Sequence, residues 1–146
     1  MKSLKYFLLM AVMMVMGLNA MADDDDRVIT YNQLPQAAQD FLKQNFAAKV
    51  PLVVTADWDD FTIVYESGEK VEFDRNGNWK DIDCRASKVP ANLVPEQIAT
   101  YLKQNYPGKT VLKLERRRMG YEVRLNNGLE VEFNRNFQVI DVDYDD

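Results

Sequence analysis

Phe41-Leu42-Lys43-Gln44-Asn45-Phe46 returns 60 residues later as Tyr101-Leu102-Lys103-Gln104-Asn105-Tyr106. The same offset relates Val71-Glu72-Phe73-Asp74-Arg75-Asn76 to Val131-Glu132-Phe133-Asn134-Arg135-Asn136, and Asp81-Ile82-Asp83 to Asp141-Val142-Asp143, with no gap between the blocks. Blocks that recur at a fixed spacing are typical of one structural unit used twice. The sequence therefore predicts two tandem repeats, and it says more about architecture than about activity.

The first 22 residues have the features of a cleavable export signal. A short basic start ends at Lys5, an apolar run extends from Tyr6 to Met16, and Ala20-Met21-Ala22 supplies the small residues at which a signal peptidase cuts. The apolar run is shorter than the ~20 residues that a membrane span requires. The alternative is an uncleaved N-terminal anchor. We expect cleavage after Ala22, a periplasmic location, and no stable membrane insertion after cleavage.

The chain from Asp23 onward is acidic. The full sequence has 18 basic and 23 acidic residues and a formal charge of −5; without Lys2 and Lys5 it has 16 basic and 23 acidic residues, a charge of −7. Such a chain repels polyphosphate, so nucleic acid is not a predicted partner. Cys84 is the only cysteine, which excludes an intramolecular disulfide. A buried thiol and an intermolecular bridge are the two interpretations of Cys84.

Each repeat begins with a predicted helix. Pro35 and Pro95 open segments in which apolar residues recur at helical spacing, and proline suits the first turn of a helix. The predicted inward stripes are Ala38, Phe41, Leu42 and Phe46 in the first repeat, and Ile98, Tyr101, Leu102 and Tyr106 in the second.

Four predicted strands follow each helix, because apolar and polar residues then alternate with period two. The apolar face should lie under the helices; it carries Leu52, Val54, Phe61, Ile63, Tyr65, Val71, Phe73 and Ile82, then Leu112, Leu114, Tyr121, Val123, Leu125, Val131, Phe133, Ile140 and Val142. The opposite face should be open to water or to a partner; it carries Thr55, Asp57, Thr62, Lys70, Glu72, Trp79, Asp81 and Asp83, then Glu115, Arg117, Glu122, Arg124, Glu130, Glu132, Val139, Asp141 and Asp143.

Turn residues separate these strands at hairpin spacing. Ser67-Gly68, Asn76-Gly77 and Asn127-Gly128 lie between alternating runs, a pattern that favours antiparallel hairpins. The predicted fold class is α+β, with two repeats of a helix plus a four-stranded antiparallel meander and with the helices on one face. The predicted organisation is a signal peptide over 1–22, a first repeat over 23–84, a linker over 85–92 and a second repeat over 93–146. Joining of the half-sheets into one continuous eight-stranded sheet would hide edge backbone and is left open.

These blocks resemble the PepSY-like family of periplasmic proteins, whose architecture is likened to that of the beta-lactamase inhibitor protein. The resemblance covers the chain from residue 23 and is carried by Leu34-Pro35 with residues 41–46, by residues 71–77, and by their copies from Val94 and Val131. It implies a periplasmic binding or inhibitory module and brings no catalytic residues. Resemblance of fold does not transfer a target.

The sequence offers little for catalysis. It has no histidine, which removes the commonest general base and a preferred zinc ligand. The pairs Asp81/Asp83 and Asp141/Asp143 lie two residues apart on strands, on the face expected to be solvated. We therefore predict that the protein is not an enzyme.

Cofactor and metal sites are not predicted either. Asp74-Arg75-Asn76-Gly77-Asn78 is similar to a calcium loop, but its glycine comes too early for an EF-hand and Arg85 stands where the distal Glu is required. A hairpin turn is the favoured interpretation of this segment.

Three features favour recognition of a partner. Trp79 is expected on the open face among acids, Trp58 at a hairpin tip between acids, and Arg116-Arg117-Arg118 forms a basic patch that the first repeat lacks. The alternatives are that Trp79 packs on a neighbouring strand and that the arginines pair with acids within the sheet.

The leading hypothesis is an exported, non-catalytic module that recognises a protein or peptide through its open sheet face or hairpin tips. Its acids would complement a basic partner. The predicted contact residues are Trp58, Glu72, Trp79, Asp81, Asp83 and Arg117. The alternatives are a small-ligand or calcium-binding periplasmic protein, or an inhibitor of a protease or beta-lactamase.

Overall fold

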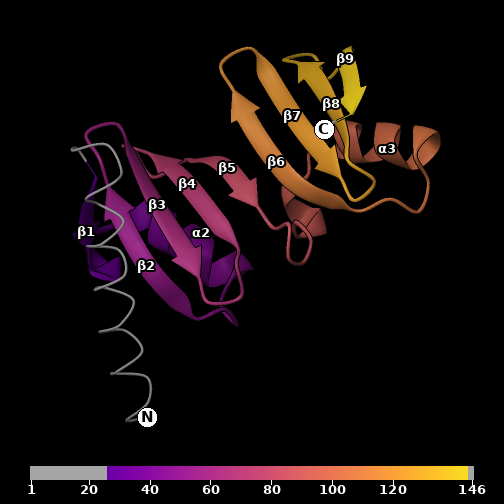
Figure 1. Cartoon of the computed structure of the whole chain (residues 1–146). Helices are drawn as coiled ribbons and strands as arrows, with labels where there is room; N and C mark the ends of the chain where they lie inside the picture. The colour runs from indigo at the N-terminus through magenta and orange to yellow at the C-terminus, as the bar shows by residue number, and fades with distance from the viewer. Residues whose placement is uncertain (1–25, 145–146) are drawn as a thin grey trace. The chain divides into compact units, whose positions relative to one another are not determined.

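The computed structural model describes residues 26–144, and the predicted signal peptide lies outside this range. The elements are named in Figure 1, and their bounds are β1 Arg27–Ile29, η1 Tyr31–Gln33, α2 Gln36–Asn45, β2 Pro51–Ala56, β3 Asp60–Tyr65, β4 Lys70–Asp74, β5 Trp79–Asp83, η2 Ala91–Leu93, α3 Glu96–Asn105, β6 Val111–Arg117, β7 Gly120–Leu125, β8 Leu129–Asn134 and β9 Val139–Tyr144.

The strands form one nine-stranded sheet whose order follows the sequence from β1 to β9. The predicted α+β class with antiparallel pairing is confirmed, and the predicted count of eight strands is wrong by one. The additional strand is β1, which pairs with β2 through Val28 and Thr55. Three residues are too few to show an alternating pattern, so β1 had no signal in the sequence. The chain divides into two compact units, one ending at Trp79 and one beginning at Lys80.

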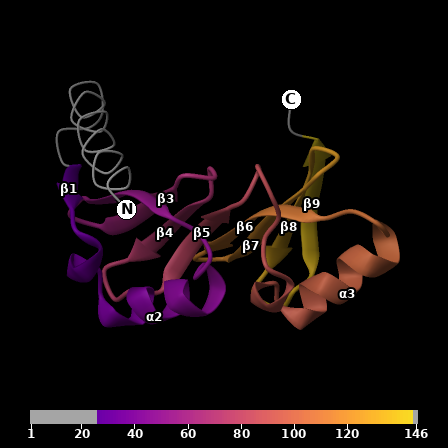
Figure 2. The ribbon, with the colours of Figure 1, turned by 90° about the horizontal axis from the view of Figure 1, so that it is seen from below.

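In the first unit, α2 covers one face of the strands. Pro35 precedes the helix with φ −53° and ψ 146°, a backbone conformation that proline allows without strain. Ala38 and Leu42 are buried, and the ring of Phe41 meets that of Phe73 edge to face with centroids 5.7 Å apart. The predicted apolar stripe of this helix therefore faces the sheet. Figure 2 shows the ribbon of α2 lying along one face of the strands of its unit.

The second unit uses α3 in the same way. Pro95 precedes the helix, and Ile98 and Leu102 are buried. The ring of Tyr101 meets that of Phe133 edge to face at 5.5 Å, so an aromatic residue of the helix again closes over a phenylalanine of the sheet.

Alternation in the strands identifies most of the core. Of the residues predicted on the covered face, eleven are buried: Val54, Ile63, Tyr65, Val71, Phe73, Ile82, Leu114, Val123, Leu125, Val131 and Phe133. Each large apolar side chain of this kind stabilises the fold by roughly 1.5–3 kcal/mol through removal from water.

Three predicted positions are wrong in exposure. Ile140 and Val142 were expected under a helix but are 56% and 41% exposed, because β9 is the last strand and pairs with β8 alone among the described strands. Asp81 was expected on a solvated face but is only 9% exposed, because β6 lies beside β5. Alternation predicts a side chain's face, but it does not predict what lies beside the strand.

No helix within residues 26–144 is long and apolar enough to cross a membrane.

Candidate functional site

Trp58 lies in the turn between β2 and β3 and is 67% exposed. The Oδ1 atom of Asp57 accepts hydrogen bonds from the backbone N–H groups of Asp59 and Asp60, each at 2.6 Å. The guanidinium of Arg75 donates to the carbonyl oxygen of Trp58. An aspartate that bonds the backbone two and three residues ahead fixes a turn. The hairpin tip therefore presents an indole ring on a held backbone.

Glu72 and Trp79 complete the predicted contact residues of the first unit. Glu72 lies on β4 opposite Thr62, and its Oε1 atom is 3.6 Å from the Nζ atom of Lys70. Trp79 begins β5 and is half-buried. Half-burial agrees with both interpretations of this ring, as a contact residue and as packing over the strand.

Asp81 and Asp83 lie on β5, next to the neighbouring strand β6. Asp83 is directly opposite Lys113, and the Nζ atom of Lys113 is 3.4 Å from Oδ2 of Asp81. Asp83 also pairs with Arg85, with Nε to Oδ2 at 3.1 Å. These two carboxylates are held by cations of their own chain.

Arg117, at the end of β6, joins three strands on the open face of the second unit. Its guanidinium pairs with Glu115 on its own strand at 3.3 Å, with Glu122 on β7 at 2.5 Å and with Glu132 on β8 at 3.8 Å. Burial lowers the pKa of Arg117, but the Glu115 hydrogen bond and the three carboxylates give a net rise. The expectation that acids within the sheet pair with this arginine is confirmed.

The acids outnumber the cations on this face. Desolvation raises the pKa of Glu122; Arg117 opposes the rise, whereas Glu130, Glu115 and Glu132 add to it. A hollow of about 60 Å³ beside Arg117 is lined by Glu122, Glu130, Glu132, Asp141 and Asp143. Glu132 and Asp141 are direct cross-strand partners, as are Glu130 and Asp143. Like charges directly opposite on a sheet are destabilising, so this arrangement favours a cationic neighbour.

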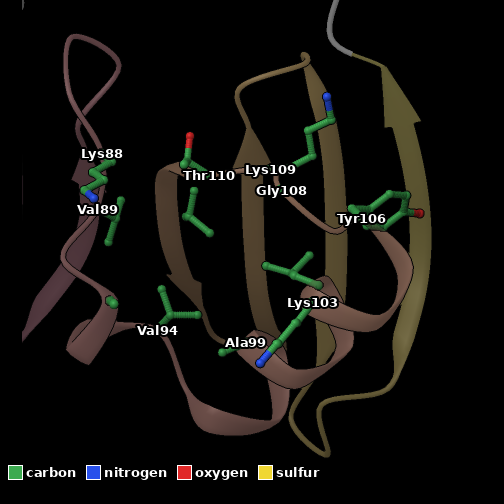
Figure 3. Close-up of a pocket in the computed structure, with 12 residues that line it drawn as sticks. Lys88, Val89, Val94, Ala99, Lys103, Tyr106, Gly108, Lys109 and Thr110 are labelled. Atoms are coloured by element: carbon green, nitrogen blue, oxygen red, sulfur yellow. The ribbon is translucent and has the colours of Figure 1, made fainter.

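A second hollow, of about 360 Å³, is lined by α3, by the segment before it and by the segment that leads from it into β6 (Figure 3). Its apolar lining includes Val89, Val94 and Leu102, and Lys88, Lys103 and Lys109 stand around it. Figure 3 shows the amino groups of Lys103 and Lys109 pointing away from one another. This hollow had no signal in the sequence, because its lining is divided between three segments.

The described residues do not assemble a catalytic or metal-binding constellation that we recognise. Within residues 26–144, no group of three or more Cys, Asp and Glu side chains is placed to hold a metal ion. Cys84 is buried, as expected for one of its two interpretations. What this surface offers chemically is an exposed indole, charged sheet positions and an uncovered strand edge.

Comparison with known proteins places the chain in a family. The family model "Putative beta-lactamase-inhibitor-like, PepSY-like" matches residues 59–141. The chain belongs to the PepSY-like family. The resemblance inferred from the repeated blocks is thereby confirmed. No curated protein matches the chain.

Solved structures of PepSY-like relatives extend this result. A "putative periplasmic protein" of Bacteroides vulgatus is 41% identical, with a TM-score of 0.80 over 84% of this chain and 99% of that one. A "putative calcium-regulated periplasmic protein" of Bacteroides thetaiotaomicron is 39% identical, with a TM-score of 0.81 over 84% and 99%. A third, from Bacteroides vulgatus and "of unknown function", is 32% identical, with a TM-score of 0.77 over 81% and 98%. All three relatives are described as periplasmic.

Proposed function

We propose that this PepSY-like chain is an exported, non-catalytic module that binds a protein or peptide in the periplasm. The observation that supports this most directly is Trp58, which is 67% exposed on a hairpin tip fixed by Asp57 and Arg75. Tryptophan is enriched among the residues that dominate interface energies, and a pre-organised loop loses little entropy on binding. The periplasmic description of the three relatives supports the location.

The other predicted contact residues have different proposed roles. Glu72, Asp83 and Arg117 carry charge on the sheet and would set complementarity and association rate more than affinity. Trp79 would add apolar contact where it is exposed. Asp81 is buried beside Lys113 and would act by fixing β5 rather than by touching a partner.

The proposal includes an internal repeat. In its support, α2 and α3 are each ten residues long and begin 60 residues apart, at Gln36 and Glu96. The first unit would then supply the tryptophan tip, and the second unit would supply the charged face.

The test is quantitative binding by the full exported chain. Proteins captured from periplasmic extract would be purified and titrated against wild-type protein and against Trp58→Ala. We expect Trp58→Ala to weaken binding by a factor of roughly 10–30, as expected for an interface anchor worth about 2 kcal/mol. Captured enzymes would also be assayed for loss of activity, which separates simple binding from inhibition.

The matched control is Met119→Ala. Met119 lies in the corresponding turn of the second unit, between β6 and β7, and is 69% exposed. This variant should bind like the wild type. Equal affinity of Trp58→Ala and wild type for every captured protein would refute the role of the tip.

Calcium binding is a second candidate, favoured by the description of the Bacteroides thetaiotaomicron relative as calcium-regulated. The carboxylates to test are those that line the small hollow, which would have to move together to hold the ion. Thermal unfolding with millimolar calcium, with magnesium as the control, tests it. A calcium-specific rise in Tm that Asp141→Asn/Asp143→Asn removes would support this candidate, and no rise would refute it.

A further inference from the structure

Two strands of the second unit, β5 and β9, carry the same short pattern but have different neighbours. Asp81-Ile82-Asp83 on β5 corresponds to Asp141-Val142-Asp143 on β9. On β5, antiparallel β6 places Leu114 opposite Ile82 and Lys113 opposite Asp83. On β9, the only neighbour among the described strands is β8. The backbone on the outer side of β9 is thus an open sheet edge.

The apolar residues of the two strands differ in burial, because β5 has β6 beside it and β9 has only β8 among the described strands. Ile82 is completely buried, whereas Val142 at the corresponding position is 41% exposed. Ile140 and Tyr144, two residues to either side of Val142, are 56% and 63% exposed. Long, apolar, exposed edge strands are rare in soluble proteins because they invite pairing with another chain. These three side chains form an uncovered apolar row.

The acids of the two strands differ in the same way. Asp81 is directly opposite Glu115 of β6, but it has the amino group of Lys113 3.4 Å away. Among the described residues, no cation lies within ion-pair distance of Asp141 or Asp143, and each of these aspartates is directly opposite a glutamate of β8. β6 supplies β5 with an apolar partner, Leu114, and with a cation, Lys113. Among the described residues, the outer edge of β9 has neither.

We propose that the outer edge of β9 binds an extended segment of a partner protein in which apolar and basic residues alternate. The segment adds to the sheet as a further antiparallel strand, as β6 adds to β5. Its backbone pairs with β9, its apolar residues cover Val142 and its neighbours, and its lysines or arginines face Asp141 and Asp143. A second copy of β9 would instead bring four aspartates together, which like-charge repulsion disfavours.

This inference rests on the proposed binding function but uses a different surface from the tip at Trp58. Loss of one site should leave the other intact. The two proposals can therefore fail separately.

The probe is a labelled peptide, Val-Leu-Lys-Leu-Lys-Val, titrated by fluorescence anisotropy against the full chain. Its first four residues copy 111–114 of β6, lysine replaces Glu115 and valine replaces Arg116. We expect saturable binding, at least about tenfold weaker binding of Val-Leu-Glu-Leu-Glu-Val, and slower hydrogen exchange of β9 amides in the complex. Slower exchange at β9 reports strand addition, which a purely electrostatic contact would not produce.

Variants of the chain locate the site. Asp141→Lys/Asp143→Lys and, separately, Ile140→Ser/Tyr144→Ser should each weaken binding by about tenfold or more. The matched control Asp59→Lys/Glu66→Lys makes the same charge change at exposed positions of the first unit and should bind like the wild type, as should Trp58→Ala. Circular dichroism verifies that each variant is folded.

Four results would overturn the proposal: no binding at millimolar peptide, equal affinity for the lysine and glutamate peptides, equal loss in Asp59→Lys/Glu66→Lys, or self-association of the free chain that Ile140→Ser/Tyr144→Ser abolishes. The last result would assign the edge to a second copy instead.

Discussion

The two units use positions 60 residues apart in chemically different ways. In the first unit, Glu69 is 1% exposed and its Oε1 atom lies 3.1 Å from the Nζ atom of Lys49. In the second, the corresponding residues are Leu129, also buried, and Lys109, which lines the hollow of Figure 3. Positions 60 residues apart in the sequence thus hold a buried ion pair in one unit and a buried apolar side chain in the other. Under the proposed internal repeat, these are one position with two chemistries.

The hollow beside α3 follows the same rule. Ala91 and Ala99 line it. The residues 60 positions earlier, in the first unit, are Tyr31 and Gln39. The hydroxyl of Tyr31 donates to the backbone carbonyl oxygen of Gln39 at 3.4 Å, and the side-chain amide of Gln39 donates to the carbonyl oxygen of Leu34 at 2.9 Å, so both larger side chains form hydrogen bonds in the first unit. Replacement of large residues by alanine leaves space in the second. The units therefore differ both in the core, at Glu69 and Leu129, and at this surface hollow.

The largest expected effect is at Gly120, the first residue of β7 after the turn from β6. Gly120 has φ +149°, and a Cβ atom there would lie 1.8 Å from the carbonyl oxygen of Phe133. Asp60 occupies this position in the first unit. We expect Gly120→Ala to lower the free energy of unfolding by more than ~3 kcal/mol, and Asp60→Ala by less than ~1 kcal/mol. Urea unfolding followed by circular dichroism measures both, and equal losses would contradict the close approach.

The buried ion pair gives the next effect. Lys49→Met leaves the carboxylate of Glu69 buried without its cation, and we expect a loss of about 2 kcal/mol because Lys49 itself is partly exposed. Lys109→Met should change stability by less than ~0.5 kcal/mol. Lys49→Met/Glu69→Leu, which gives the first unit the residue of the second, should recover most of the loss. Absence of recovery in urea unfolding at pH 7 would show that the units are not interchangeable here.

The fold was predictable where a single strand or helix carries its own signal. Period-two alternation identified the faces of Ile63 and Val123, and the stripes from Ala38 and Ile98 identified the covered sides of the helices. The burial of Glu69 was not predictable, because its cation is 20 residues away and the preceding Ser67-Gly68 indicates a solvated turn. The exposure of Val142 was not predictable either. Alternation does not indicate the order of the strands, so it could not show that β9 is the last strand of the sheet.

The candidate site was predictable to a similar extent. Trp58 was expected at a hairpin tip between acids, and it is there; the Arg75 guanidinium that holds the tip comes from 17 residues further along the chain and had no local signal. The edge of β9 was hidden because its Asp-x-Asp pattern matches that of β5, and alternation does not show that β9 has only β8 beside it among the described strands.

The turns before β5 and β9 each contain a residue with left-handed backbone. Gly77 has φ +87°, and a Cβ atom there would lie 2.9 Å from Cβ of Pro35. Phe137, 60 residues later, has φ 61° and stacks on Tyr121 with ring centroids 5.6 Å apart. We expect Gly77→Ala to destabilise the fold by about 1–2 kcal/mol. In Phe137→Gly, relief of strain and loss of stacking should nearly cancel. Thermal unfolding of both variants tests the contrast.

The smallest expected effect compares Glu122 with Thr62, which stands at the corresponding position of the first unit. Burial and the acids around it raise the pKa of Glu122 in the folded chain above that in the unfolded chain. Its contribution to stability is therefore present below the unfolded pKa of about 4.3 and is lost as the pH rises through the folded pKa. Removal of the charge should stabilise the fold at neutral pH, even though the ion pair with Arg117 is lost.

Glu122→Gln should therefore have a Tm about 1–2 °C above that of the wild type at pH 7, and the difference should vanish below about pH 4, where both side chains are neutral. The matched control is Glu72→Gln in the first unit, where the carboxylate faces Thr62 and pairs with Lys70, so that no gain is expected. A lower Tm of Glu122→Gln at pH 7 would mean that the bond to Arg117 outweighs the repulsion among the carboxylates. In that case the acids around Arg117 are balanced by that arginine, and only Asp141 and Asp143 would face the cations of the proposed partner.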